Sequence, residues 1–534
     1  MLDEVSAKSF GRIRATVLVI LAVLLALGIS EPGRAATDAR LVQGILVDQT
    51  DHGGDLQQDK EFIGGAEQIE LRGNAFALEQ SNGTGEVFLK LAPLPDFRGH
   101  RSTWDVRLKS DGQCDWNRED GYPWVSEKYR GGKWGRMAAA HKLQRRIRPY
   151  DPAADGLFLT NTWGDRSADS RVSEKFLLKE ITAAARLGAD VVQIDDGWQL
   201  GKTKNSASAN GGGAWNGFWA SNPKFWDVNP DRFPNGLQPL TEAARRSGVQ
   251  IGLWFAPDST HEAANWRRDA DALLGLWKEF GIRFFKIDAI KITSPKAEEN
   301  LRHLFEAVRS ESRSEISFDF DVTAERRFGY FGTIELGRIF LENRYTDSRS
   351  YWPHETLRAA WKLSRWVDPV RLRLEWLNHA RNAKKYGDSP LAPLKYEPDT
   401  LFAITMFCSP LGWFEVQNLP NNYLAEAGPL IAKWRQHREA IFNGITLPVG
   451  DEPDGKTWTG FVSVSDASAG YALVFRELNP ADSWSIELPG TAGRLGAVEI
   501  LGGSGTASLS GGRLQVTVPK LLGFVWVRYT LAKP

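Results

Sequence analysis

The sequence has few cysteines, no excess of either charge and no histidine pattern typical of a metal site. Cys114 and Cys408 are its only cysteines, which excludes a disulfide scaffold and leaves a single bridge between them open. Lysine plus arginine and aspartate plus glutamate balance at 66 each, so neither nucleic acid nor an anionic membrane surface is expected as a partner. The eight histidines include no HExxH motif and no close pair beside acidic residues, and we therefore expect no metal and no other cofactor.

Only one long apolar run is present, Ala15–Ile29, and it lies in a segment typical of an export signal. The run is preceded by three basic residues, Lys8, Arg12 and Arg14. It is shorter than the ~20 residues that a membrane-spanning helix needs. We therefore expect residues 1–36 to be the signal peptide of an exported protein, periplasmic or extracellular, with an uncleaved membrane anchor as the alternative. Apart from this leader, we expect no contact with a membrane.

The remaining chain changes character twice. Over residues 37–150, short alternating runs separated by glycine, aspartate and asparagine predict an N-terminal β-sandwich-like domain. Over residues 151–445, apolar runs alternate with helical patterns, which predicts an α/β fold, a catalytic (β/α)8 barrel of the TIM type. Short alternating runs return over residues 446–534 and predict a C-terminal antiparallel β-sandwich.

Six barrel strands can be placed from their apolar runs, at residues 156–163, 190–194, 249–255, 282–287, 316–321 and 338–343. The seventh and eighth strands are expected in and around Leu401–Val416, and a helix over Ala425–Phe442 is expected to close the barrel. The low-complexity segment Thr203–Gly213 follows the second strand and could be either a mobile loop over the site or a solvated insertion.

Polar side chains at the ends of the predicted strands are the candidate site residues, because barrels of this kind act at the C-terminal ends of their strands. Acidic groups follow five consecutive strands, with tryptophan beside several of them. The candidates are Asn161, Trp163, Asp195, Asp196, Trp198, Trp254, Asp258, Lys286, Asp288, Asp319, Asp321, Arg344 and Asp347. Cleavage of a glycosidic bond needs one ionised carboxylate, one protonated carboxylic acid and further acceptors for sugar hydroxyls. This set supplies all three, and metal ligation is the weaker interpretation.

Five segments of the predicted barrel resemble the α-galactosidases (melibiases) of glycoside hydrolase family 36, whose clan also holds family 27. They are NTW at Asn161–Trp163, VVQIDDGWQ at Val191–Gln199, GLWFAP at Gly252–Pro257, FFKID at Phe284–Asp288 and RYTDSRSYW at Arg344–Trp352. The most specific feature is the order of DDGW, GLW and KxD at these strand ends. The resemblance covers roughly residues 155–445, and it implies an enzyme that releases terminal α-linked galactose.

The resemblance assigns Asp288 as the catalytic nucleophile and Asp347 as the acid/base of a double displacement with retention. Lys286 shares the strand face of Asp288 and is expected to keep a neighbouring carboxylate ionised. Asp195 and Asp196 would accept hydrogen bonds from the axial hydroxyl and the hydroxymethyl group of galactose. The remaining substrate-binding candidates, of which the first two would border the sugar, are Trp198, Trp254, Lys286, Arg344, Asp321 and Trp163.

Two departures from the family pattern leave alternatives open. The segment Asp319–Tyr330 lacks the Cys/Ser-Gly-Gly run of many relatives, so Asp321 or Glu325 is the reserve candidate for the acid. The third strand continues as Ala256-Pro-Asp where relatives often have Glu-Pro-Glu. The rivals are an α-N-acetylgalactosaminidase or an α-galactosyl transferase of the same clan, or a catalytically inactive carbohydrate-binding barrel. The expected partner is a small-molecule or oligosaccharide α-galactoside, and the oligomeric state stays open.

Overall fold

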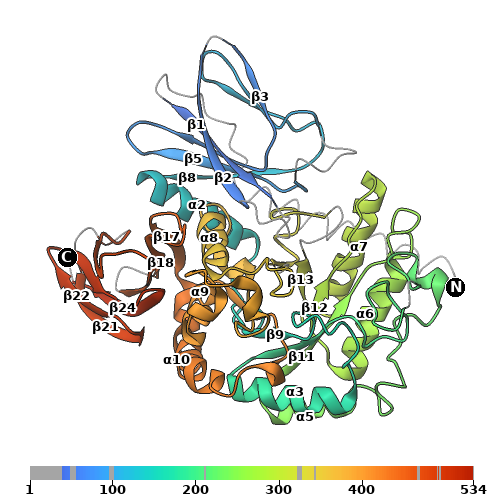
Figure 1. The fold of residues 1–534 in the computed structure, drawn as a ribbon. Coiled ribbons are helices and arrows are strands. Elements are labelled where there is room, and N and C mark those ends of the chain that lie inside the picture. The colour runs from blue at the N-terminus through green and yellow to red at the C-terminus, as the bar shows by residue number, and fades with distance from the viewer. Residues whose placement is uncertain are drawn as a thin grey trace.

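A closed barrel of eight parallel strands lies at the centre of the protein, with antiparallel sheets at both ends of the chain (Figure 1). The computed structural model describes residues 39–47, 56–65, 67–94, 102–209, 212–321, 327–341, 344–465, 469–489, 491 and 495–532. The expected signal peptide, residues 1–36, lies outside these ranges. No helix within them is long and apolar enough to span a bilayer.

The N-terminal part contains two antiparallel sheets. The order of the larger one is β2 (Gln57–Ile63), β1 (Arg40–Leu46), β4 (Ala75–Glu79), β5 (Gly85–Lys90) and β8 (Trp124–Tyr129). The smaller one consists of β3 (Ile69–Leu71), β6 (Val106–Leu108) and β7 (Cys114–Trp116). Alternating apolar residues of both sheets share one core, which includes Phe76, Phe88, Trp116 and Trp124. The sequence interpretation missed the helix α2 (Gly132–Ile147), which follows β8 and packs against it and against the first C-terminal strand.

The barrel strands follow one another around the barrel in chain order. They are β9 (Leu159–Asn161), β10 (Val191–Ile194), β11 (Gln250–Phe255), β12 (Phe284–Ile287), β13 (Ser317–Asp321), β14 (Gly337–Phe340), β15 (Leu372–Trp376) and β16 (Ser409–Gly412). The predicted barrel is therefore confirmed, and its first six strands overlap the predicted runs. The seventh strand, β15, was placed wrongly, because Arg373 and Glu375 made its run look solvent-facing although both side chains are buried inside the protein.

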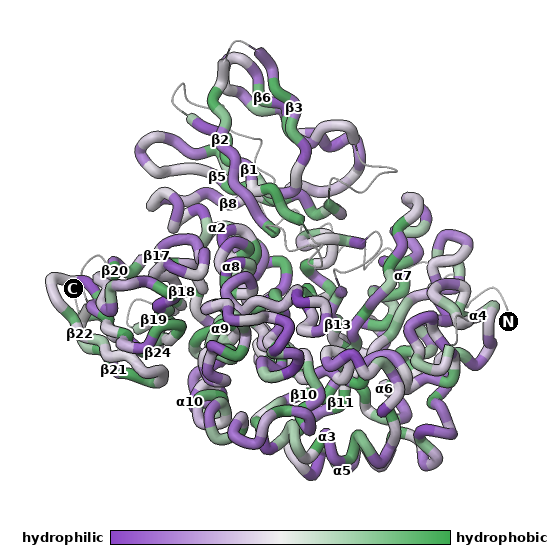
Figure 2. The backbone as a smooth tube through the Cα atoms, in the orientation of Figure 1, coloured by the Kyte–Doolittle hydropathy of each residue, from purple (hydrophilic) through white to green (hydrophobic). Residues whose placement is uncertain are grey.

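Helices on the outside of the barrel follow most strands. They are α3 (Glu174–Leu187), α4 (Phe218–Ser221), α5 (Gln238–Arg246), α6 (Trp266–Phe280), α7 (Pro295–Glu311), α8 (Pro353–Leu363), α9 (Pro398–Thr405) and α10 (Tyr423–Asn443). Short 3-10 turns, η1 (Pro369–Arg371), η2 (Ala383–Tyr386), η3 (Pro393–Lys395) and η4 (Val416–Asn418), lie in the loops. In Figure 2, α3 and α5 alternate between hydrophilic and hydrophobic along the tube, as expected for helices that cover a core with one face. Helix α10 confirms the helix expected over Ala425–Phe442.

Two further antiparallel sheets follow α10. The order of the larger one is β17 (Ile445–Gly450), β18 (Trp458–Val464), β19 (Ala469–Arg476), β24 (Gly523–Leu531) and β21 (Leu495–Gly503). The smaller one is β20 (Ser483–Ile486), β23 (Arg513–Thr517) and β22 (Thr506–Ser510). The bridge that the sequence left open does not form, because Cys114 and Cys408 are both free thiols.

Candidate active site

Three polar side chains, Asn161, Asp195 and Asp321, meet around Lys286 at the C-terminal end of the barrel. We call these four residues the Lys286 cluster. The Lys286 Nζ atom lies 3.1 Å from Asp195 Oδ2 and 3.2 Å from Asp321 Oδ2. Asn161 Nδ2 donates a hydrogen bond of 2.8 Å to the same oxygen of Asp195. The side chains of Lys286, Asp195 and Asp321 are at most 4% exposed. The structure therefore brings together four of the candidate residues, which lie in or directly after four different strands.

Among the described residues, one cation in this cluster faces two buried carboxylates. Removing charged groups from water costs free energy unless each is paired and hydrogen-bonded. Carboxylate oxygens accept several hydrogen bonds, and an ammonium group donates three. The cluster can therefore accept hydrogen bonds from hydroxyl groups of a bound ligand and donate to its oxygens, which suits a polyol.

Asp288 lies directly after β12, and its carboxylate is held by one N–H donor on each oxygen. Trp254 Nε1 donates to Oδ2 over 3.1 Å, and the backbone N–H of Ala289 donates to Oδ1 over 2.6 Å. Ala289 adopts a left-handed backbone conformation, with φ of 50°, which L-residues rarely occupy outside tight turns and functional sites. Asp288 is only partly buried. A fixed, accessible carboxylate is the arrangement that a nucleophile needs.

Indole rings form a wall beside Asp288, but not in the way that the sequence suggested. Trp254 is 1% exposed, and Trp198 is fully buried behind it, with its Nε1 donating to the Trp254 carbonyl oxygen over 2.8 Å. Trp198 thus supports Trp254 and offers no face to a sugar. The partly exposed ring is Trp215, stacked on Trp254 with 6.3 Å between centroids and 27° between planes. Sequence reasoning missed Trp215, although it lies just after the glycine-rich segment flagged as a loop over the site.

Asp196 anchors the chain that follows β10. Gln199 Nε2 donates to its Oδ1 over 2.7 Å, and the Thr203 hydroxyl donates to its Oδ2. Burial raises the pKa of Asp196 to about 7. The next residue, Gly197, has φ of 120°, and a Cβ atom there would lie 2.4 Å from Asp169 Cβ, so only glycine fits. Both oxygens of Asp196 therefore serve the turn, while Asp195 faces the Lys286 cluster.

Asp347 lies on a different loop, after β14, and reaches the Lys286 cluster through a series of aromatic contacts. Its Oδ2 atom lies 3.6 Å from Arg166 Nε, and its side chain is 35% exposed. The Arg166 guanidinium lies 4.3 Å from the centre of the Tyr345 ring, whose centroid is 6.1 Å from that of Trp413. Lys286 Nζ lies 5.0 Å from the Trp413 ring. Asp347 therefore belongs to the same end of the barrel.

The remaining predicted residues lie around these groups. Arg344 is buried, with Nη1 donating to Thr356 Oγ1 over 3.2 Å and Nε 3.7 Å from Glu375 Oε1, so it ties the loop to α8 and β15. Trp163 is partly buried, and its backbone N–H donates to Asn161 Oδ1 over 2.8 Å. The reserve acid Glu325 lies outside the described residues. Within the described ranges, no group of three or more His, Cys, Asp or Glu side chains could hold a metal ion.

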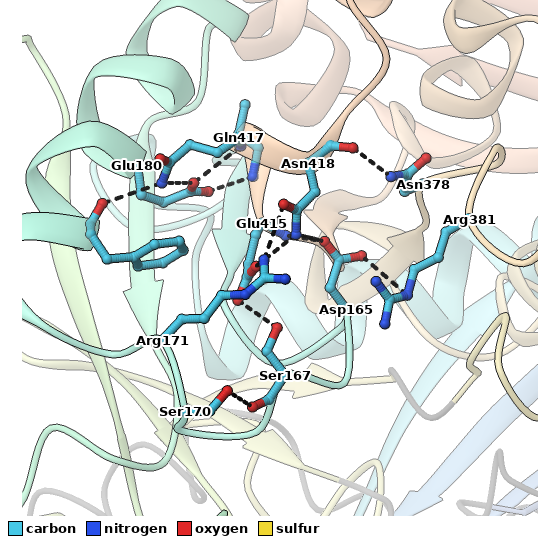
Figure 3. A network of polar contacts seen from close by, with 12 residues as sticks. Asp165, Ser167, Ser170, Arg171, Glu180, Asn378, Arg381, Glu415, Gln417 and Asn418 are labelled. Atoms are coloured by element: carbon cyan, nitrogen blue, oxygen red, sulfur yellow. Dashed lines mark hydrogen bonds and ion pairs between the residues drawn. The ribbon is translucent and has the colours of Figure 1, made fainter.

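Buried carboxylates connect the loops after β9 and β16, as Figure 3 shows. Asn418 Nδ2 donates to Asp165 Oδ2 and to Glu415 Oε2, each over 2.7 Å. Ser167 Oγ and Arg171 Nη1 donate to Glu415 over 2.8 and 2.5 Å. Arg166 lies between Asp165 and Ser167, so this network fixes the part of the loop from which Arg166 reaches Asp347.

Glu180 extends this network from helix α3 to η4 (Figure 3). Its carboxylate accepts hydrogen bonds from the backbone N–H groups of Val416, over 2.5 Å, and Gln417, over 3.2 Å. Burial raises the pKa of Glu180 to about 7, against the opposing effect of these donors. The loops that carry the candidate site are therefore held by groups outside it.

A second buried ion cluster, the Asp319 cluster, lies deeper in the barrel. Asp319 Oδ1 and Oδ2 accept hydrogen bonds from Arg338 Nε, over 2.5 Å, and Arg373 Nε, over 3.0 Å, and Arg338 Nη1 lies 3.0 Å from Asp155 Oδ1. All four side chains have 0% exposure. Burial acts to raise the pKa of Asp319, but the two guanidinium groups outweigh it and lower the pKa. Asp319, a strand-end candidate in the sequence, is therefore sealed inside the barrel.

Part of the chain is similar in sequence to known α-galactosidases. Residues 123–276 match the family model named Melibiase. α-Galactosidase 2 of Pediococcus pentosaceus is 33% identical over 98 residues, 18% of this chain and 11% of that protein. α-Galactosidase C of Emericella nidulans is 29% identical over 155 residues, 27% of this chain and 19% of that protein. The matches thus span a fifth or less of these relatives' length.

Solved structures show the same fold over nearly the whole chain. The α-galactosidase from Lactobacillus brevis has a TM-score of 0.66 at 13% identity, covering 94% of this chain and 74% of its own. The GH36 α-galactosidase AgaA from Geobacillus stearothermophilus, in complex with raffinose, has a TM-score of 0.64 at 15% identity, covering 93% and 75%. The chain therefore resembles α-galactosidases in sequence over part of the barrel and shares the fold of GH36 α-galactosidases over almost all of its length, which confirms the predicted resemblance.

Proposed function

We propose that the protein is a retaining glycoside hydrolase that releases terminal α-linked galactose from oligosaccharides or other galactosides. One observation carries the proposal: in an α-galactosidase fold, a carboxylate held by two N–H donors, Asp288, follows the strand that supplies Lys286 to a buried polar cluster. The relatives matched in sequence are α-galactosidases, and the structural relative AgaA was solved with raffinose, an α-galactoside.

In the proposed reaction, Asp288 attacks the anomeric carbon of the galactosyl group while Asp347 protonates the departing glycosidic oxygen. The bond to the leaving group breaks as the ester to Asp288 forms. Asp347 then removes a proton from water, which attacks the same carbon from the face that the leaving group occupied, and Asp288 leaves as a carboxylate. Two displacements retain the α-configuration, and they require the two carboxyl groups about 5–5.5 Å apart in the working complex.

The Lys286 cluster is the proposed site for the galactose hydroxyls. Asp195 and Asp321 accept hydrogen bonds from hydroxyl groups, and Asn161 and Lys286 keep those acceptors in place. A site whose buried polar groups are matched by substrate hydroxyls discriminates strongly, because an analogue without them leaves buried groups unpaired.

The test is the stereochemistry of the first product. Proton NMR of a reaction with nitrophenyl α-galactoside is expected to show α-galactose before mutarotation, and melibiose and raffinose are expected to release galactose. First appearance of β-galactose would contradict double displacement. Faster release of nitrophenol from the N-acetylgalactosaminide would favour the first rival, and galactose binding with no turnover would favour the inactive barrel.

We also propose that the protein is exported, since three basic residues precede the apolar run Ala15–Ile29 at its N-terminus. Expression in a bacterial host followed by N-terminal sequencing of the periplasmic or secreted form tests this. A new N-terminus close to residue 37 is expected, whereas an intact Met1 on a membrane-bound form would indicate an anchor.

A further inference from the structure

We infer that the leaving-group side of the site is built for α-galactosides whose leaving group carries an anion, either a carboxylate or a sulfate ester. The inference rests on the proposed function, because it assigns a substrate class to the same site. Three exposed cations from three different barrel loops, Arg166, Arg349 and Lys385, border Asp347 and form what we call the basic rim.

Each cation of the basic rim has a contact that places it. Arg166 Nε lies 3.6 Å from Asp347 Oδ2, and Lys385 Nζ donates a hydrogen bond of 2.6 Å to the Asp347 carbonyl oxygen. Arg349 lies two residues after Asp347 in the chain, and its guanidinium is 5.9 Å from the centre of the Trp352 ring. Burial raises the pKa of the Tyr386 hydroxyl. The charge of Arg349 acts to lower this pKa and the charge of Asp347 acts to raise it, so both charges are felt at that hydroxyl.

The backbone around the rim is in conformations that L-residues rarely adopt. Arg166 has φ of 57°, Arg349 has 65°, and Asn382, next to η2, has 56°. The side chain of Asn382 donates a hydrogen bond of 3.1 Å to Thr346 Oγ1, which docks η2 and Lys385 onto the Asp347 loop. Such strain persists only where the surrounding structure imposes it, and it gathers at functional sites. The backbone that carries these cations is therefore held in a defined conformation.

The acids on these loops do not neutralise the rim. Asp165 and Asp169 on the loop after β9 are buried, and they are bonded to Asn418 and Arg232 respectively. Within the described part of the three loops, the acids that remain accessible are Asp347 itself, Asp388 and Glu397, and Glu397 is paired with Lys520. The leaving-group side therefore presents more positive than negative charge, in a protein whose formal net charge is zero.

The proposed chemistry gives this charge a purpose. A general acid gives its proton to the departing oxygen, so it lies beside the leaving group during the reaction. The leaving group of the proposed reaction therefore lies within reach of Arg166, whose Nε is 3.6 Å from Asp347 Oδ2. A carboxylate or sulfate on the leaving group would form a hydrogen-bonded ion pair with Arg166, which a neutral leaving group cannot form.

Two aryl galactosides of nearly equal size test the inference on the full-length protein: meta-carboxyphenyl and meta-carbamoylphenyl α-galactoside. We expect kcat/KM to be about tenfold higher for the carboxylate, because a guanidinium pairs well with a carboxylate at a specific site. The preference should shrink as salt is raised from low to molar concentration. A meta-sulfooxyphenyl galactoside distinguishes the two anions, and a preference for either one over the amide supports the inference.

Arg166→Gln is expected to bring the ratio of the two kcat/KM values close to one, with Arg166→Lys in between. Arg186→Gln, the same change in the last turn of α3 on an exposed residue, is the matched control and should keep the wild-type ratio. A wild-type ratio of one or less, in an enzyme that hydrolyses both substrates with retention, would overturn the inference and leave the proposed function standing. Hydrolysis of neither would overturn the proposed function. The salt titration needs no variant and decides the matter should Arg166→Gln fail to fold.

Discussion

Two buried ion clusters share strand β13 and differ in how many cations face each carboxylate. In the Asp319 cluster, each carboxylate faces two guanidinium groups: Asp319 accepts hydrogen bonds from Arg338 and Arg373, and Asp155 pairs with Arg338 and Arg148. In the Lys286 cluster, which includes Asp321 two residues further along the strand, Asp195 and Asp321 share one ammonium group among the described residues. The first cluster is sealed from solvent, whereas the second lies next to the partly exposed Asp288.

This difference separates a structural from a functional use of the same residue types. A buried ion pair contributes little to stability compared with well-packed apolar groups, but removing one partner is costly. A sealed cluster of this kind can therefore hold the barrel together without taking part in chemistry. A cluster with fewer cations per carboxylate at the open end of the barrel can also accept hydrogen bonds from the hydroxyl groups of a ligand, and such bonds add affinity and specificity.

The largest effect is expected at the mouth of the barrel. Asp288→Gly should lower kcat for nitrophenyl α-galactoside by at least about a thousandfold, because no other group replaces the covalent step. Azide should restore part of the rate and yield β-galactosyl azide, since azide enters from the face that Asp288 occupied. Asp347→Ala is the matched variant, and its azide product should be the α-anomer. The reverse pair of products would exchange the two roles, and full turnover without azide would reject Asp288 as nucleophile.

The Asp319 cluster should respond in stability. Arg338→Met leaves Asp155 with Arg148 alone and Asp319 with Arg373 alone, and we expect the free energy of unfolding to fall by about 3–5 kcal/mol because Arg338 bridges the two buried carboxylates. Thermal unfolding followed by circular dichroism measures this loss. The kcat of the fraction that stays folded should change by less than about threefold, because Arg338 is sealed away from the site.

Lys286→Met is the matched change in the Lys286 cluster. Its kcat/KM should fall by about a hundredfold, as a donor that orients the acceptors of the sugar is lost. Its free energy of unfolding should fall less than that of Arg338→Met, because at the mouth of the barrel water can enter the place that the ammonium group leaves. Equal losses of stability and equal residual activities in the two variants would break the distinction between the clusters.

Glu180 extends the comparison to a buried carboxyl that faces backbone N–H donors. Its pKa is raised from 4.5 to about 7, so the protonated group contributes stability that is fully present below pH 4.5 and lost as the pH rises through 7. Over this window the wild type should lose up to about 3 kcal/mol relative to Glu180→Gln, which cannot ionise. Urea unfolding at several pH values measures the difference between the two proteins. The pKa values of Asp196 and Asp269 are also raised to about 7, but both proteins contain these residues, so their contributions cancel in the difference. Parallel pH profiles of the two proteins would contradict the assignment.

Sequence reasoning could place the site residues at one end of the barrel, because parallel strands all end at the same edge. It could not separate Asp319 from Asp321, since both alternate with phenylalanine in one run. Which of them faces arginine depends on how the strands align when the barrel closes. For the same reason β15 was misplaced: its Arg373 and Glu375 are buried beside Asp319 of β13 and Arg344 of the loop after β14, which only the folded barrel brings together.

The aromatic wall could not be predicted either, for a related physical reason. Trp198 and Trp254 stand at strand ends, where a sugar contact was expected, but the strand ends point their rings into the barrel wall. Trp215 comes from a loop with no periodic pattern, and a loop's position follows from tertiary contacts such as that of Thr203 with Asp196. The motifs of the resemblance lie at strand ends, so they do not predict which residues of the covering loops reach the site.

The smallest effect is expected at this loop, where Trp215 covers the site beside the Lys286 cluster. Trp215 stacks on Trp254, which in turn donates a hydrogen bond to Asp288, so its ring covers one side of the nucleophile. Trp215→Ala should raise KM for nitrophenyl α-galactoside by about tenfold, with a smaller effect on kcat, because an apolar surface that stacks on the sugar is lost while the reacting groups remain. Trp219→Ala, on α4 in the same loop region, is the control, since its Nε1 donates to Asp269 and not toward the site. An unchanged KM in Trp215→Ala would show that the Lys286 cluster binds its ligand without this cover, and the contrast with the sealed Asp319 cluster would then rest on the number of cations alone.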